Sequence, residues 1–155
     1  MPEQSSSENT NLQPVTPYLC IRGAGAAIEF YQRAFGAREL MRLDAPGGLI
    51  GHAEIMIEYA RIMLSDEFPE MDVVSPATLG GSPVTIHLYV NDADTLAARA
   101  VSAGMTVLRP VETQFYGDRG GKFRDPFGHI WWIATHVEDV SMDEIRRRAE
   151  SLYGA

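Results

Sequence analysis

Cysteine is nearly absent from this sequence of 155 residues, since Cys20 is the only one. A single cysteine excludes an intrachain disulfide, which fits a reducing compartment. Long hydrophobic runs are also missing, and no signal peptide opens the chain, so no membrane-spanning segment is expected. We therefore expect a cytoplasmic protein that does not associate with membranes.

Basic residues are scarce as well. The 13 Lys and Arg residues are outnumbered by 21 Asp and Glu residues, which gives a formal net charge of −8 at pH 7. Because no basic stripe is present to neutralise phosphates, we do not expect nucleic-acid binding. The acidic balance is compatible with a cationic ligand. With 45% hydrophobic and 22% charged residues, the chain is typical of a globular protein of one domain.

What the chain does contain is a repeat at an offset of 69 residues, as from Val15 to Val84. Residues 15–21 share the pattern Val-Thr-x-x-Leu-x-(Ile/Val) with residues 84–90, and the apolar residues 62–64 fall on 131–133. Four glycines match at the same offset, Gly48 with Gly117 and Gly51 with Gly120. The repeat predicts two similar modules, related by a pseudo-twofold axis, whose equivalent faces meet at a shared cleft.

Hydrophobic periodicity predicts the order strand–helix–strand–strand–strand in both modules. In the first, strands are expected over residues 15–21, 37–43, 52–57 and 61–65, with a helix that ends at Gly36. In the second, they are expected over residues 84–90, 106–110, 115–124 and 129–135, with a helix from Asn91 or Asp92 to Gly104. A last helix is expected from near Ser141. These elements predict an α+β fold.

The same elements predict one domain with a segment on either side. A polar, Ser-rich tail is expected to be disordered over residues 1–13. The predicted divisions of the rest are module one at 14–66, a linker at 67–82, module two at 83–140, and a C-terminal helix at 141–155.

Five short motifs accompany the repeat. They are His52-Ala53-Glu54, Leu64-Ser65-Asp66-Glu67, Tyr116-Gly117-Asp118-Arg119, Asp125-Pro126-Phe127-Gly128-His129 and Thr135-His136-x-Glu138-Asp139. Together with the tandem βαβββ modules, they resemble the vicinal oxygen chelate superfamily, and within it the PhnB-like glyoxalase/bleomycin resistance protein group. The resemblance covers roughly residues 14 to 140. It implies a curled mixed sheet with helices on its convex side, an open cleft on the other side, and a homodimer.

The resemblance also implies where a metal would bind, because metal-dependent relatives take one ligand from the first and one from the last strand of each module. His87 is the candidate on the first strand of module two, and the repeat puts Tyr18, Met63 and Trp132 at the three equivalent positions. A stable divalent site needs three or four donors among His, carboxylate and thiolate groups. Only His87 is such a donor, so we favour neither a metal nor another cofactor.

A second group of polar residues leaves another site open. His52 and Glu54 are two residues apart and project from the same face of one strand. If the following hairpin has an even-numbered loop, they share this face with Met56 and Met63 and lie near His87. An odd-numbered loop would turn them to the helix-covered side. The group could hold a divalent metal through His87, His52 and Glu54, or use Glu54 and His87 as catalytic acid or base.

The remaining candidates are side chains suited to a small-molecule cleft. Such a cleft is lined by large apolar and amphipathic groups with a few convergent polar ones. The expected ligand-binding residues are Tyr18, His52, Met56, Met63, His87, Tyr89, Phe123 and Trp132.

Three functions follow from these candidates. The favoured one is a small-molecule-binding protein that is metal-independent and uses an aromatic and Met-lined cleft. The second is an enzyme, a metal-dependent lyase or dioxygenase-like member with a non-standard ion site. The third is a catalytically silent dimeric homologue. Fold alone does not separate them, and the expected partners are a second copy of the chain and a small-molecule ligand.

Overall fold

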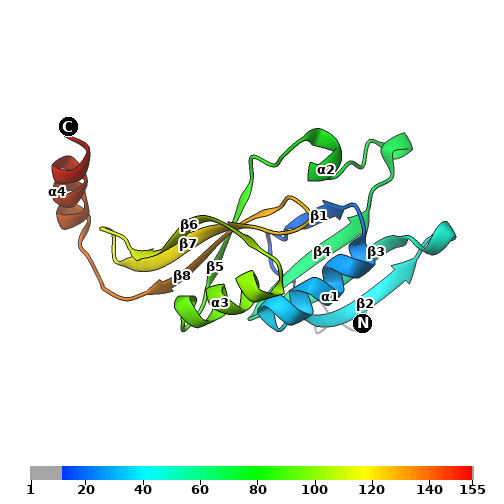
Figure 1. Ribbon diagram of the computed structural model, residues 1–155, viewed down its shortest axis with the longest axis horizontal. Coiled ribbons are helices and arrows are strands. Elements are labelled where there is room, and N and C mark those ends of the chain that lie inside the picture. Colours follow the sequence, from blue (N-terminus) through cyan, green and yellow to red (C-terminus); the bar gives the residue numbers. More distant parts are fainter. Residues whose placement is uncertain (1–11, 155) are drawn as a thin grey trace, which may run out of the picture.

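The computed structural model describes residues 12–154 and forms two modules of the same plan (Figure 1). The predicted tail over residues 1–13 lies outside the described residues, except for its last two. Module one consists of β1 (Tyr18–Ile21), α1 (Ala24–Phe35), β2 (Arg38–Asp44), β3 (Ile50–Ile57) and β4 (Ala60–Asp66). Module two consists of β5 (Thr85–Tyr89), α3 (Ala93–Ala103), β6 (Thr106–Thr113), β7 (Asp118–Arg124) and β8 (Ile130–His136).

Each module has one four-stranded sheet, in the order β1-β4-β3-β2 and β5-β8-β7-β6. The first strand of each module runs parallel to the last, and the other neighbours are antiparallel. The predicted α+β fold of two tandem βαβββ modules is therefore confirmed.

The segments outside the sheets differ in how they meet the modules. The predicted linker contains a short helix, α2 (Pro76–Leu79), whose N-cap Ser75 accepts a hydrogen bond from the Thr78 N–H. The last helix, α4 (Met142–Tyr153), starts after Ser141 as predicted, has no buried residue and extends away from the modules (Figure 1). None of the helices within residues 12–154 is long and apolar enough to cross a membrane.

Strand β1 is shorter than the sequence pattern predicts, because it begins at Tyr18 and not at Val15. Pro17 has no N–H to give to a sheet, and Val15 is 84% exposed. The carbonyl of Pro17 still accepts a hydrogen bond from the Met63 N–H at 3.0 Å, so the chain joins the sheet only from this point.

The repeat extends to the way each helix begins. In module one, the buried Asp66 at the end of β4 accepts hydrogen bonds from the N–H groups of Gly23 and Ala24 at the start of α1. In module two, the hydroxyl of Thr135 in β8 accepts the N–H of Ala93 at the start of α3. Asp66 and Thr135 are 69 residues apart, so the last strand of each module satisfies the first turn of its helix.

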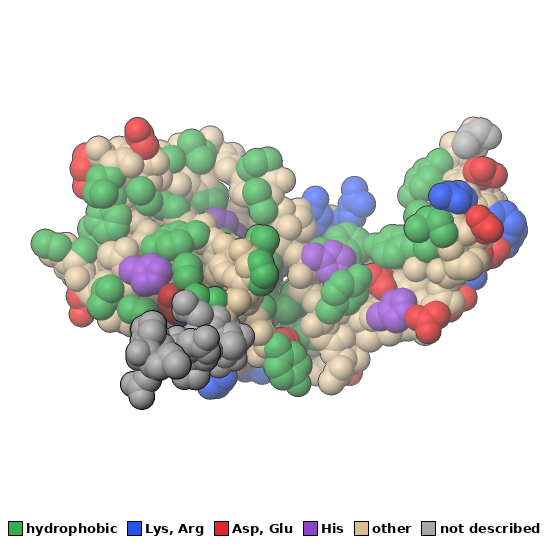
Figure 2. Space-filling view, turned by 180° about the vertical axis from the view of Figure 1, so that it is seen from behind, with side chains coloured by type: hydrophobic (Ala, Val, Ile, Leu, Met, Phe, Trp, Pro, Cys, Tyr) green, Lys and Arg blue, Asp and Glu red, His purple; other side chains and the backbone are tan. Residues whose placement is uncertain are grey.

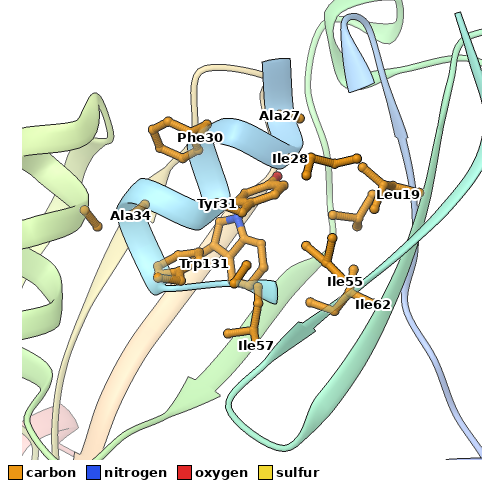
Figure 3. Packing of buried hydrophobic residues seen from close by; sticks show 14 of the residues in the cluster. Leu19, Ala27, Ile28, Phe30, Tyr31, Ala34, Ile55, Ile57, Ile62 and Trp131 are labelled. Atoms are coloured by element: carbon orange, nitrogen blue, oxygen red, sulfur yellow. The ribbon is translucent and has the colours of Figure 1, made fainter. Parts of the chain in front are cut away.

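The core lies between the sheets and the helices, and α1 and α3 pack against each other. Alternate residues of each strand, such as Ile55 and Leu64 in module one, point toward the helices and are fully buried. Trp131 of β8 reaches into module one and packs 4.8 Å from the ring of Phe35 and 5.5 Å from that of Tyr31 (Figure 3). The modules thus share one hydrophobic core.

The glycine matches in the repeat are wrong as structural equivalences. The offset is 69 for the paired strands β1/β5 and β4/β8, but Glu54 faces Met63 while Lys122 faces Trp132, so β3 and β7 are related by 68 residues. Gly120 therefore corresponds to His52 and not to Gly51.

Candidate functional site

The face of each sheet opposite the helices, which we call the open face, carries the predicted site residues. In β3 and β4, Glu54 pairs with Met63 across a hairpin whose last pair is Ile57 with Ala60. This confirms the even-numbered loop, which turns His52, Glu54 and Met63 away from the helices.

The open face of module one contains a chain of hydrogen bonds that starts at β1. The Tyr18 hydroxyl lies 2.8 Å from Nδ1 of His52, and Nε2 of His52 lies 3.2 Å from Oε1 of Glu54. Arg61 donates to the other carboxylate oxygen of Glu54 at 2.8 Å. Because a carboxylate only accepts, His52 donates from Nε2, and in its neutral form it accepts the Tyr18 proton at Nδ1. The chain therefore orients a half-exposed phenol through an imidazole and a buried carboxylate.

On module two, the open face has a different composition. His87 pairs with Trp132 in the sheet, and Trp132 pairs with Lys122. The His87 ring lies 4.5 Å from the ring of Tyr89 and 6.4 Å from that of Trp132. An imidazole, an indole and a phenol thus lie side by side with a lysine on the same face.

A second hydrogen-bond chain borders this face. Tyr89 donates to Oδ2 of Asp118 at 2.6 Å, and His136 donates to Oδ1 at 2.9 Å and to Asp139 at 2.7 Å. The hydrogen bond to Asp118 is the main cause that raises the pKa of Tyr89 to about 12. Burial raises the pKa of Asp118, but the hydrogen bonds from Tyr89 and His136 outweigh burial and leave that pKa below its usual value. Hydrogen bonds to Asp139 and Asp118 raise the pKa of His136. Asp118 is therefore a buried carboxylate held ionised by its neighbours.

One predicted cleft residue lies elsewhere. Phe123 pairs with Trp131, not with Trp132, and is 2% exposed in the hydrophobic core. The expectation that Phe123 lines the cleft is corrected, because alternate residues of a strand point to opposite faces. Its neighbour Lys122 takes the predicted place on the open face.

The four positions that would ligate a metal in relatives do not fit one here. Tyr18 pairs with Met63 and His87 with Trp132, so each module places its two candidate residues side by side. The four groups are a phenol, a thioether, an imidazole and an indole, and only the imidazole is a strong ligand for a divalent ion. The donor set of a glyoxalase-type metal is therefore missing at these positions.

The alternative metal site is not assembled either. His52 and Glu54 are brought together on module one, whereas His87 contacts Tyr89 and Trp132 on module two. Within residues 12–154, no group of three or more His, Cys, Asp or Glu side chains is placed to hold a metal ion.

Each open face forms its own cavity. In module one, a cavity of about 430 Å³ is lined mainly by apolar groups, including Tyr18, Phe68, Met71 and Val73. In module two, a cavity of about 350 Å³ includes His87 and Trp132 in its lining.

Residues that the sequence interpretation missed complete these faces. Arg61 was not a candidate, although its place opposite Met56 could have been read from the same hairpin parity that placed Glu54. Lys122 and Arg109 were also missed, and both line the module-two cavity. Cys20 stays outside this chemistry, since burial, followed by the charges of Glu67 and Asp66, raises the pKa of its thiol to about 11. A thiol of this kind is a poor nucleophile at neutral pH.

Known proteins with the same architecture include relatives in bacteria and plants. The chain is 42% identical over 153 residues to the uncharacterized protein Rv0887c of Mycobacterium tuberculosis (strain ATCC 25618 / H37Rv), with 96% of this chain and 90% of that protein covered. The X-ray structure of the At5g48480 product from Arabidopsis thaliana has a TM-score of 0.64 at 28% identity, covering 79% of this chain and 98% of that one. A PhnB protein from Bacillus cereus has a TM-score of 0.58 at 19% identity over 79% of this chain and 99% of that one, a likeness of fold alone.

A family model gives the assignment. The model described as Glyoxalase/Bleomycin resistance protein/Dioxygenase superfamily matches residues 13–133, which is most of the chain. With its two βαβββ modules, the chain belongs to the glyoxalase/bleomycin resistance protein/dioxygenase superfamily, also called the vicinal oxygen chelate superfamily.

Proposed function

We propose that the protein binds a small organic molecule on the open faces of its modules, without a glyoxalase-type metal. The observation that carries this proposal is the residue set at the four family positions, where Tyr18, Met63 and Trp132 accompany the lone imidazole of His87. Phenol, thioether and indole groups bind organic ligands well and divalent ions poorly. The apolar cavity of module one supports the same proposal.

The two tryptophans of the chain provide a direct test of binding. Trp131 is fully buried, whereas Trp132 is half-buried on the open face. Titration with a panel of aromatic, cationic and anionic small molecules should change the Trp132 emission in a saturable way, and a Trp132→Phe variant should lose this change. If no compound gives a saturable signal in fluorescence or calorimetry, the proposal is wrong.

Metal independence has its own measurement. Elemental analysis of the purified protein should find no stoichiometric divalent ion, and chelator treatment should leave ligand affinity unchanged. A stoichiometric ion that is lost in a His87→Ala variant would contradict metal independence.

We also propose that the functional unit is a homodimer. Strand β2 at the edge of module one has no buried residue, and its Leu40 and Leu43 side chains are 38% and 58% exposed. An edge strand with exposed apolar side chains requires cover to avoid uncontrolled association. Sedimentation at micromolar concentration should give twice the chain mass of 17.1 kDa, and a monomer at that concentration would exclude the dimer.

An enzymatic role is the second candidate, supported by the hydrogen-bond chain on module one. Glu54 orients His52, which in turn contacts the Tyr18 hydroxyl, an arrangement suited to general acid–base chemistry on a bound ligand. Such a base should exchange an acidic C–H of a bound carbonyl compound with deuterium from D₂O. His52→Asn should abolish this exchange and retain binding. Exchange that is equally fast in His52→Asn would exclude this role.

A further inference from the structure

Four side chains form a row across the open face of module two, one from each strand. Arg109 of β6 pairs with Lys122 of β7, Lys122 pairs with Trp132 of β8, and Trp132 pairs with His87 of β5. All four line the same cavity of about 350 Å³. The sheet register, and not a flexible loop, therefore places two cations beside an indole and an imidazole.

The two cations in this row lack a counter-charge. Within residues 12–154, neither Arg109 nor Lys122 forms an ion pair, and no Asp or Glu lines their cavity. This is unusual in a chain in which acidic residues outnumber basic ones by 21 to 13. Like charges at directly opposed positions of a sheet are destabilising. An anion bound between Arg109 and Lys122 would remove that repulsion.

Aromatic side chains form the wall of this cavity next to the row. The ring of Phe115 lies 5.3 Å from Tyr116 and 6.0 Å from Tyr153, both at steep interplanar angles of 87° and 79°. Tyr153 belongs to α4, which is held here because Arg148 donates to the Phe115 carbonyl and pairs with Glu138. A deep notch separates α4 from the rest of the molecule, with Lys and Arg side chains at its edge (Figure 2). The cavity thus combines cations with flat apolar surfaces.

Module one has the opposite character at the same place. Its equivalent row is Tyr18, Met63, Glu54 and Met41. Glu54 stands where module two has Lys122, and it is already paired with Arg61. The two open faces therefore differ in charge, and an anion has a reason to select module two.

We propose that the open face of module two is a binding site for a small planar anion, an aromatic carboxylate. The guanidinium of Arg109 and the ammonium of Lys122 contact the carboxylate, because charge-assisted hydrogen bonds of this kind are the strong ones. The aromatic ring of the ligand packs against Trp132 and the aromatic wall. This inference rests on the proposed function for the claim that the open faces take a ligand, and it replaces the cationic ligand suggested by the net charge.

Calorimetric titration with three compounds of the same shape tests the inference. The probes are 1-naphthoate, the neutral 1-naphthamide and the cationic 1-naphthylmethylammonium. We expect 1-naphthoate to bind at least about tenfold more tightly than the amide, and the ammonium compound to bind most weakly, as the loss of a hydrogen bond to a charged group implies. Naphthoate affinity should also fall as the salt concentration rises.

Variants locate the site. Lys122→Gln and Arg109→Gln should each weaken naphthoate binding about tenfold and leave naphthamide binding unchanged. Lys122→Arg should retain most of the affinity for naphthoate. The matched control is Arg124→Gln, which removes a cation from the same strand outside this cavity and should have no effect. Thermal unfolding establishes that each variant is folded.

The possible failures can be told apart. Equal affinity for naphthoate and naphthamide, or naphthoate binding that is unchanged in both glutamine variants, would overturn the anion site and leave the proposed function intact. If none of the three probes binds, the anion site is wrong. If the wider ligand panel also gives no binding, the proposed function is wrong as well.

Discussion

At the scale of single residues, Asp125 joins the two modules. Its Oδ1 atom accepts the N–H groups of Phe127 and His129 within the turn, and Oδ2 accepts the Tyr31 hydroxyl and the Trp131 indole N–H. In Asp125→Asn, the amide nitrogen would face donors, so we expect a loss of about 2–3 kcal/mol in the free energy of unfolding, measured in urea. Tyr31→Phe, which removes one donor only, should cost less. An Asn variant as stable as the parent would contradict this role.

His136 is the residue whose charge should depend on its neighbours near neutral pH. The hydrogen bond to Asp139 is the main cause that raises the pKa of His136 above 6.5, followed by the hydrogen bond to Asp118. Because the folded-state pKa is raised, the stabilisation is complete below about pH 6.5 and is lost as the pH rises through the folded-state pKa. Asp139→Asn should lower the His136 pKa, as followed by NMR of the imidazole C–H signals. Asp143→Asn on α4 is the control, and an unchanged His136 pKa in Asp139→Asn would exclude the assignment.

At the scale of elements, alternation in the sequence predicted one hairpin face and missed the other. The β3–β4 connection has two residues, so the even-loop assumption placed Glu54 beside Met63. The β7–β8 connection has five, residues 125–129, because the Asp125 side chain accepts the N–H of His129 and keeps it in the turn. A four-residue turn read from Asp-Pro-Phe-Gly puts Phe123 on the open face, whereas the five-residue turn puts Lys122 there.

Arg109 shows a different limit of sequence-based prediction. The pairing of β6 with β7 shifts in register on both sides of Arg109, so simple alternation along β6 does not give the direction of its side chain. The fold and the module-one face could therefore be predicted from periodicity and the repeat. The cationic row of module two depends on a side-chain-stabilised turn and on a bulge, which periodicity does not reveal.

Gly120 leads to a prediction about the open face of β7. A Cβ atom at this position would lie 2.6 Å from the indole nitrogen of Trp132 and 2.8 Å from the carbonyl oxygen of Ile133. We expect Gly120→Ala to displace the indole and to lower the free energy of unfolding by about 1–3 kcal/mol, with a shift in Trp132 emission. Gly25→Ala in α1 is the control, because its nearest contact is an ordinary 3.8 Å. Equal stability of the two variants would show that β7 tolerates the extra methyl group.

At the scale of the whole molecule, the modules share a core although their open faces differ. Helix α1 packs against α3, and Trp131 of module two lies among Tyr31 and Phe35 of module one. The charge of each open face can change without disturbing this core, because the open-face residues point away from it. A duplicated fold with unlike faces is therefore suited to binding one ligand by two chemically different surfaces.

The shared core predicts that the modules unfold together. In a Trp132→Phe background, Trp131 is the only tryptophan, and its emission reports the contact between the modules. Urea unfolding followed by Trp131 emission and by far-UV circular dichroism should give one coincident transition. Phe35→Ala should lower the free energy of unfolding by about 3–5 kcal/mol in both probes, because it leaves a cavity beside Trp131. Ala26→Gly on the exposed side of α1 is the control, expected to cost only about 1 kcal/mol. Two separate transitions, or a Phe35→Ala effect confined to one probe, would show that the modules fold independently.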